Sequence, residues 1–201
     1  MNSSEDRRIA RTKAAIREAL VALIEEKGFD ALTVKDIAAK ANINRGTFYL
    51  HYKDKFDLLD QTLEDIARDV ESILLEITSF SVADFINGQK PSAVIVKVFE
   101  YFNANASLMQ AILATKGNYA LQNRIKKIMW QNIFEKNYAT FIKKENLRVP
   151  SKYFASYIAA AHFGVVQEWL ENGRRETPEE MARILSNLTI RGPLTAVGIL
   201  P

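Results

Sequence analysis

The sequence predicts an all-α protein. Only 8 Gly and 5 Pro are spread over its 201 residues, and no stretch keeps the alternation of apolar and polar residues that marks a half-buried strand. Apolar residues recur instead at steps of three and four, a spacing that places them on one face of a helix. From this pattern we expect about nine helices.

The first expected helix ends at Lys27-Gly28, where a cation in the last turn precedes a glycine suited to the position after a helix. Basic side chains surround its apolar stripe, so one face is expected to pack on the core. That stripe consists of Ile9, Ile16, Leu20, Leu23 and Ile24.

Two short helices are expected next, over residues 34–41 and 45–52. Thr33 can cap the first of them, and Asp36 three residues later gives the pattern of a capping box. Residues 42–44 between the two helices are expected to form a turn, because their two asparagines tolerate a positive φ and cap helices.

The most regular helix is expected after Asp54, which can cap it. Its apolar positions form a heptad-like seam of Phe56, Leu59, Leu63, Ile66, Val70, Ile73 and Ile77. A loop over 78–90 precedes the remaining helices, which are expected over 91–105, 107–116 (capped by Ser107), 119–144, 150–173 and from Thr177-Pro178 onward. The apolar tail 192–201 has no capping signal and is assigned no element.

The composition excludes several kinds of site. Without Cys there is no disulfide, thiol nucleophile or thiolate metal site, and two histidines are too few for a multi-histidine metal centre. The sequence contains no run of 18 apolar residues, so it predicts no membrane-spanning helix. Its N-terminus is polar, unlike a signal peptide. We therefore expect a cytoplasmic protein with no membrane partner, metal, cofactor or catalytic residue, and not an enzyme.

The positive charge is confined to one end of the chain. Residues 1–55 contain 11 Lys and Arg against 8 Asp and Glu, which accounts for the whole net charge of +3, while residues 56–201 are neutral. Such asymmetry favours a polyanionic partner for the basic part, although a solvated surface has a similar composition. We expect two domains with these boundaries, 1–55 and 56–201.

The segment 33–55 has the pattern of a helix-turn-helix. Its inward positions are apolar: Ile37, Ala38, Ala41, Ile43, Phe48 and Tyr52. The outward face of its second helix shows hydrogen-bonding groups, as a helix that enters the major groove must: Asn44, Arg45, Thr47, Tyr49 and His51. An αα-hairpin with a solvated polar face has the same pattern, so spacing alone leaves both interpretations open.

Residues 9–60 resemble the N-terminal domain of TetR/AcrR-type transcriptional regulators. The resemblance rests on many positions in order, chiefly Thr33, Asp36-Ile37-Ala38, Ala41 to Tyr49, His51-Tyr52, Asp54-Lys55 and Leu58-Leu59, with Lys27-Gly28-Phe29 before them. Two residues depart from the family pattern. Asn42 stands where glycine is usual in the turn, and Asn44 stands where Ser or Thr usually caps the second helix.

The resemblance implies roles for the matched positions. It implies that Thr33, Tyr49, His51 and Lys55 bind phosphates of double-stranded DNA, and that Gly46 lets the backbone approach it closely. The candidates for base contacts are Asn44, Arg45 and Thr47, because Arg suits the acceptors of guanine and Thr packs on a thymine methyl. His51 has a second interpretation, a half-buried imidazole that packs against the helix end.

The family's C-terminal domain is helical, dimerises through its last two long helices and often encloses a ligand. For this chain the resemblance implies a homodimer interface of Tyr157, Ala161, Gly164, Val165, Trp169, Met181, Ile184 and Leu188. Small residues let another backbone come close, although a helix buried within one subunit has the same composition. A ligand pocket is expected among Tyr101, Phe102, Met129, Trp130, Tyr138 and His162, where an ordinary core is the alternative.

The sequence thus favours a dimeric regulator that binds a near-palindromic operator, a repressor released by a small apolar or aromatic ligand. The alternative is a transcriptional coactivator of the same fold that is controlled by a protein partner. An enzyme is the least favoured class, because the chain has neither a glycine-rich phosphate loop nor a paired nucleophile.

Overall fold

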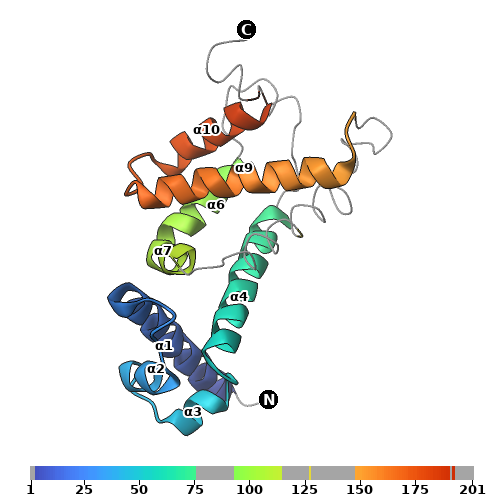
Figure 1. Cartoon of the computed structure of the whole chain (residues 1–201). Coiled ribbons are helices and arrows are strands. Elements are labelled where there is room, and N and C mark those ends of the chain that lie inside the picture. The colour runs from blue at the N-terminus through green and yellow to red at the C-terminus, as the bar shows by residue number, and fades with distance from the viewer. Residues whose placement is uncertain (1–2, 76–92, 115–126, 128–147, 191, 193–201) are drawn as a thin grey trace. The chain divides into compact units, whose positions relative to one another are not determined.

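The computed structural model describes residues 3–75, 93–114, 127, 148–190 and 192. Those residues form eight helices and no strand, which confirms the all-α class (Figure 1). The helices group into two compact units, and the division falls within two helices, between Asp65 and Ile66 and between Ala106 and Ser107. The expected helix over 119–144, apart from residue 127, and the expected loop over 78–90 lie outside the described residues, as does nearly all of the tail.

The first unit contains the helix-turn-helix. It is built from α1 (Ser3–Lys27), α2 (Val34–Lys40), α3 (Arg45–Tyr49), the beginning of α4 (Lys55–Leu75) and most of α7 (Ala106–Ala114). α1 ends as expected, because Gly28 adopts a positive φ of 76° and its N–H bonds the carbonyl of Ile24 at 2.8 Å.

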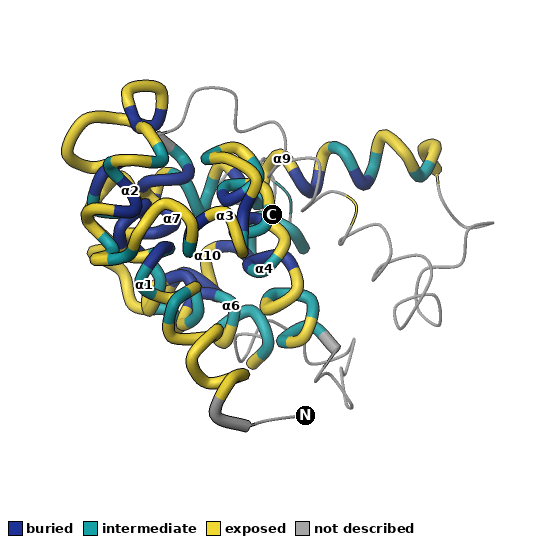
Figure 2. Tube along the Cα trace, turned by 90° about the horizontal axis from the view of Figure 1, so that it is seen from below, coloured by how far each residue is buried: buried dark blue, intermediate teal, exposed yellow. Residues whose placement is uncertain are grey.

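The core of the first unit draws one or more side chains from each of these helices. Its fully buried members include Ile16, Leu20, Ile37, Phe48 and Leu58, and Ala111 adds a contact from α7. Figure 2 colours all buried residues of the described chain dark blue. Each of the fully buried Ile, Leu and Phe side chains stabilises the unit by about 1.5–3 kcal/mol relative to an exposed position.

Ile9 and Phe56, one from each of the two expected apolar stripes, are exposed. Ile9 is 40% exposed and lies in the first third of α1. Phe56 is 58% exposed and packs edge-on against Phe29, with ring centroids 5.5 Å apart. The heptad-like spacing gave the correct helix, but its first position lies at the margin of the core.

The second unit contains α6 (Ala93–Ala104), α9 (Ser151–Glu171) and α10 (Pro178–Ile190), and α10 packs against both other helices. Phe99 on α6 and Trp169 on α9 meet edge to face, with their ring centroids 5.3 Å apart. Both side chains are buried, so they form part of this unit's own core.

Two expected helix starts can be compared with the structure. Thr177 and Glu180 form a capping box at α10, because each side chain accepts a hydrogen bond from the other's backbone N–H. Ser107 was expected to cap a helix but lies within α7, which begins one residue earlier at Ala106. Among the described helices, none is both long and apolar enough to cross a membrane.

Candidate nucleic-acid interface

The start of α2 is fixed by a capping box between Thr33 and Asp36. The Thr33 N–H donates to the Asp36 carboxylate at 3.0 Å, and the Asp36 N–H donates to the Thr33 hydroxyl at 3.2 Å. The Lys27 ammonium lies 2.9 Å from the same carboxylate. Lys27, together with the hydrogen bonds from Thr33, lowers the pKa of Asp36 to about 2. Thr33 is therefore held in place by the fold, while its side chain stays at the surface.

The turn between α2 and α3 adopts the conformation that its asparagine predicts. Asn42 has a φ of 53°, which confirms that it takes the positive value usual for glycine there. The next residue, Ile43, donates its N–H to the carbonyl of Ala38 at 3.0 Å and packs its side chain against the core. The small Ala38 is itself buried, so α3 can follow α2 closely.

Asn44 caps α3 in the role that Ser or Thr fills elsewhere. Its side-chain oxygen accepts hydrogen bonds from the backbone N–H of Thr47 at 2.7 Å and from the Thr47 hydroxyl at 3.1 Å. A Cβ atom at Gly46 would lie 3.2 Å from that same oxygen. Position 46 is thus restricted by the cap as well as by any approach of DNA.

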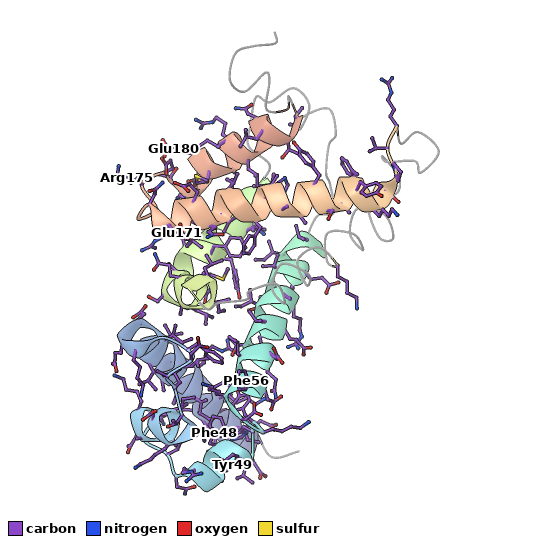
Figure 3. The ribbon with its side chains drawn as sticks, in the orientation of Figure 1. Phe48, Tyr49, Phe56, Glu171, Arg175 and Glu180 are labelled. Carbon is purple, nitrogen blue, oxygen red and sulfur yellow. The ribbon has the colours of Figure 1, made fainter. Side chains whose placement is uncertain are left out.

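The outer face of α3 carries a cation paired with an aromatic ring. Phe48 is fully buried, whereas its neighbour Tyr49 is 49% exposed and points away from the core (Figure 3). The Arg45 guanidinium lies 5.9 Å from the centroid of the Tyr49 ring, and its Nη2 is 3.4 Å from the Tyr49 hydroxyl. Because the two residues are four apart, both side chains lie on the same exposed face.

His51 lies just beyond α3 and is half-buried. Burial lowers its pKa, and the positive charge of Lys13 lowers it further. A neutral imidazole keeps one N–H donor, so it can still donate to a phosphate. The half-buried position and the phosphate contact are therefore compatible.

Sequence reasoning did not select Lys13 or Leu50. The Lys13 ammonium lies 5.9 Å from the centroid of the Tyr52 ring, which brings a cation from α1 near His51. Leu50 is 80% exposed at the end of α3, next to Tyr49. The cluster of basic residues on α1 could have identified Lys13 as a candidate, whereas nothing in the sequence distinguishes an exposed leucine such as Leu50 from a buried one.

Lys55 is engaged within the fold. Its ammonium donates to three backbone carbonyls of the α1–α2 turn, those of Phe29, Asp30 and Leu32, at 3.1, 2.9 and 2.9 Å. The structure therefore brings Asn44, Arg45, Thr47 and Tyr49 together on α3, and it places Lys55 beside Leu32, the residue before Thr33.

The expected dimer residues divide into two groups in the second unit. The exposed or partly exposed ones are Tyr157, Ala161, Gly164, Val165, Ile184 and Leu188. Trp169 and Met181 are only 2% and 4% exposed, so both belong to the core of a single chain and the interface assignment of these two is corrected. The Trp169 indole N–H also donates to the carbonyl of Glu176 at 3.0 Å, within the same chain.

The expected ligand residues are partly described. Phe102 is buried, and the Tyr101 hydroxyl donates to the Asp69 carboxylate at 2.9 Å. The other described member, His162, lies 2.9 Å from the hydroxyl of Thr189 through Nε2. Met129, Trp130 and Tyr138 lie outside the described residues.

The hydrogen bond of His162 fixes its tautomer. The Thr189 hydroxyl donates its single proton to the carbonyl of Leu185 at 2.7 Å. It must therefore accept from His162, which places the ring proton on Nε2 and leaves Nδ1 as an acceptor. Burial lowers the pKa of His162 to about 4, so the ring is neutral at pH 7.

Comparison with known proteins covers both parts of the chain. Residues 16–62 match the family model for bacterial regulatory proteins of the tetR family, and residues 89–191 match the model for a transcriptional regulator C-terminal region. The HTH-type transcriptional regulator YxbF of Bacillus subtilis is 22% identical over 172 residues, which are 85% of this chain. This chain spans only 43% of the length of that relative.

Two solved structures are similar to nearly the whole chain. A TetR-family transcriptional regulator from Syntrophomonas wolfei has a TM-score of 0.68 and 23% identity, over 94% of this chain and 96% of that one. The transcriptional regulator FadR from Bacillus subtilis, solved in complex with stearoyl-CoA, has a TM-score of 0.63 and 21% identity, over 89% and 98%. Together with the match of the C-terminal model to half of the sequence, these findings show that the chain belongs to the TetR family of transcriptional regulators.

Proposed function

We propose that this protein is a dimeric, cytoplasmic repressor that binds a near-palindromic DNA operator and is released by a small apolar or aromatic ligand. The observation that carries the proposal is the outer face of α3, where Asn44, Arg45, Thr47 and Tyr49 form one polar surface above the buried Phe48. A helix held in this way can enter the major groove without disturbing the core.

The residues of this face divide by chemistry into base and phosphate contacts. Arg45 can donate two hydrogen bonds to guanine, and the Thr47 methyl can pack on thymine. Tyr49 and His51 each have one N–H or O–H donor suited to a phosphate, and Thr33 extends that set at the start of α2. Sequence preference then depends on Arg45 and Thr47, whereas the other three positions add affinity on every duplex.

Dimerisation is supported by the exposed face of α9. A Cβ at Gly164 would meet no heavy atom within 4 Å in the described part of the chain. Glycine within a helix costs about 0.5–1 kcal/mol relative to alanine. Packing inside this chain therefore does not explain why position 164 is a glycine. Close approach by α9 and α10 of a second copy accounts for it, and two α3 helices would then meet half-sites about 34–36 Å apart.

An apolar effector is supported by the composition of the second unit and by the structural similarity to FadR. The FadR structure contains stearoyl-CoA, whose acyl chain is apolar. A ligand would release the protein from DNA if it bound more tightly to a conformation in which the two α3 helices no longer match their half-sites.

The test begins with the selection of bound duplexes from a random library, using the wild-type protein. Arg45→Ala is then expected to lose about 1–3 kcal/mol on the selected duplex and to relax the preference at one base pair. Tyr49→Phe removes the hydroxyl but keeps the ring beneath Arg45, and it is expected to weaken binding to specific and random duplexes by the same factor. Fluorescence anisotropy measures both.

Arg175→Ala is the matched control, because this exposed arginine lies in the second unit, between α9 and α10. It is expected to leave both affinities unchanged. The proposal fails if the wild-type protein selects no sequence, or if Arg45→Ala and Arg175→Ala have equal effects.

A further inference from the structure

The ammonium of Lys55 lies in a cage of backbone oxygens and phenyl rings. Besides its bonds to the carbonyls of Phe29, Asp30 and Leu32, it lies 5.0 Å from the ring centroid of Phe29 and 5.3 Å from that of Phe56. An ammonium has three N–H donors, so these carbonyls use all of them. The faces of the two rings add a cation–π attraction.

The position of Lys55 in α4 is unfavourable for a cation that has no such partners. Lys55 is the first residue of α4, where the positive end of the helix dipole disfavours a cation. The three carbonyl oxygens offset that repulsion with their own partial negative charge.

The carbonyls depend on Lys55 in turn. Those of Asp30 and Leu32 accept no other hydrogen bond within the described ranges, whereas that of Phe29 also accepts from the Leu32 N–H at 3.2 Å. Leaving the partly buried Leu32 carbonyl without a donor is costly, whereas the exposed Asp30 carbonyl can bond water instead. A movement of the ammonium to a DNA phosphate would break all three bonds together.

We infer that Lys55 is a positioning residue that fixes the α1–α2 turn to the first turn of α4, and that it does not donate to a DNA phosphate. Leu32 directly precedes Thr33, the N-cap of α2, so the same contact sets where α2 begins relative to α4. The inference rests on the proposed DNA-binding function and reassigns one of the residues to which the family resemblance gave a phosphate.

The first test needs no DNA. In the free wild-type protein, acylation of Lys55 by a water-soluble ester is expected to be at least about tenfold slower than acylation of Lys53. A tenfold factor corresponds to about 1.4 kcal/mol of stabilisation of the Lys55 ammonium by its contacts. Lys53 is exposed and two residues away, which makes it an internal control. Mass spectrometry of peptides follows both sites, and equal rates would overturn the inference.

The second test separates the cage from a phosphate contact. Lys55→Met removes the donors and is expected to lower the thermal midpoint by roughly 4 °C or more, while the slope of log Kd against log salt stays unchanged. Lys55→Arg keeps the charge, but its planar fork cannot direct three N–H groups at converging carbonyls, so it is expected to lower the midpoint as well. Lys53→Met is the matched control and is expected to leave the midpoint unchanged.

A phosphate contact gives the opposite results. Lys55→Met would then reduce the salt slope by about 0.9 with an unchanged midpoint, and Lys55→Arg would restore the slope. Acylation and melting are measured without DNA, so they decide the positioning role of Lys55 even if the wild-type protein selects no duplex and the proposed function fails, and the salt slope decides the phosphate contact.

Discussion

The helix-turn-helix and the α9–α10 pair are held together by different kinds of contact. In α2 and α3 the ordering hydrogen bonds join residues three apart, such as Thr33 with Asp36 and Asn44 with Thr47. α9 has no side-chain cap hydrogen bond at its start, and it packs through contacts with distant parts of the chain, such as Phe99 against Trp169. Local hydrogen bonds leave the outer face of α3 free to vary, whereas remote apolar contacts fix which face of α9 is buried.

The exposed surfaces of the two regions differ in the same way. α3 exposes hydrogen-bonding groups, while α9 exposes Tyr153 and Tyr157 together with small residues such as Gly164. Exposed and buried residues alternate along the α9 trace in Figure 2. The first surface suits a polar ligand that is read by hydrogen bonds, and the second suits an apolar surface that excludes water.

Substitutions on the buried and exposed faces of α9 should have the largest effects, on the stability of the subunit and on dimerisation respectively. Trp169→Ala is expected to reduce the free energy of unfolding by about 3–5 kcal/mol, because it opens a cavity in the core of the second unit. Tyr157→Ala removes a side chain that is 56% exposed, so it is expected to weaken dimerisation without that loss in the subunit. Chemical denaturation at several protein concentrations, together with sedimentation equilibrium, measures the two quantities.

The reverse outcome would contradict the division of α9 into a core face and an interface face. If Trp169→Ala changed only the concentration dependence, this residue would belong to the interface after all. A wild-type protein that sedimented as a monomer at micromolar concentration would remove the interface altogether.

Acid should destabilise the second unit through His162. Its folded pKa of about 4 lies below the ordinary value of 6.5, so the unfolded chain binds more protons between these two pH values. The contribution of His162 to the free energy of unfolding is therefore fully present above pH 6.5. It decreases by about 3 kcal/mol as the pH drops toward 4. His162→Gln keeps a donor for Thr189 but cannot titrate, and it is expected to lack this part of the pH dependence.

The comparison of the two denaturation curves isolates His162, because His51 and Asp36 titrate in both proteins. Equal loss of stability in wild-type protein and His162→Gln between pH 7 and pH 4 would show that the imidazole is not buried as described.

The turn between α2 and α3 should give the smallest effect. Asn42→Ala is expected to cost about 1 kcal/mol, because alanine avoids the positive φ of this position. Asn42→Gly relieves the same constraint and is expected to leave stability unchanged or slightly raised. Thermal denaturation of both variants tests this, and equal midpoints for the two would contradict the conformation of the turn.

Local signals explain how much could be predicted from the sequence. The capping box of Thr33, the helix start at Thr177, the cap of Asn44 and the positive φ of Asn42 depend on neighbours within four residues, so residue type and spacing predicted them. The inward positions of Phe48 and Tyr52 followed from helical periodicity.

The remaining features depend on contacts that spacing does not encode. α9 is apolar on more than one side, so periodicity could not assign Trp169 to the core and Tyr157 to the surface. Lys55 bonds carbonyls 23 to 26 residues away, and nothing in its own neighbourhood distinguishes it from an exposed lysine.

The shortness of α3 has a consequence for when DNA binding can occur. A five-residue helix is not stable by itself in water, because nucleation costs more than so few hydrogen bonds return. α3 therefore persists only while Phe48 stays in the core. If the helices around Phe48 unfold, α3 unfolds with them and DNA binding is lost. Heating should abolish operator affinity and the near-ultraviolet signal of the first unit's aromatic residues in a single transition.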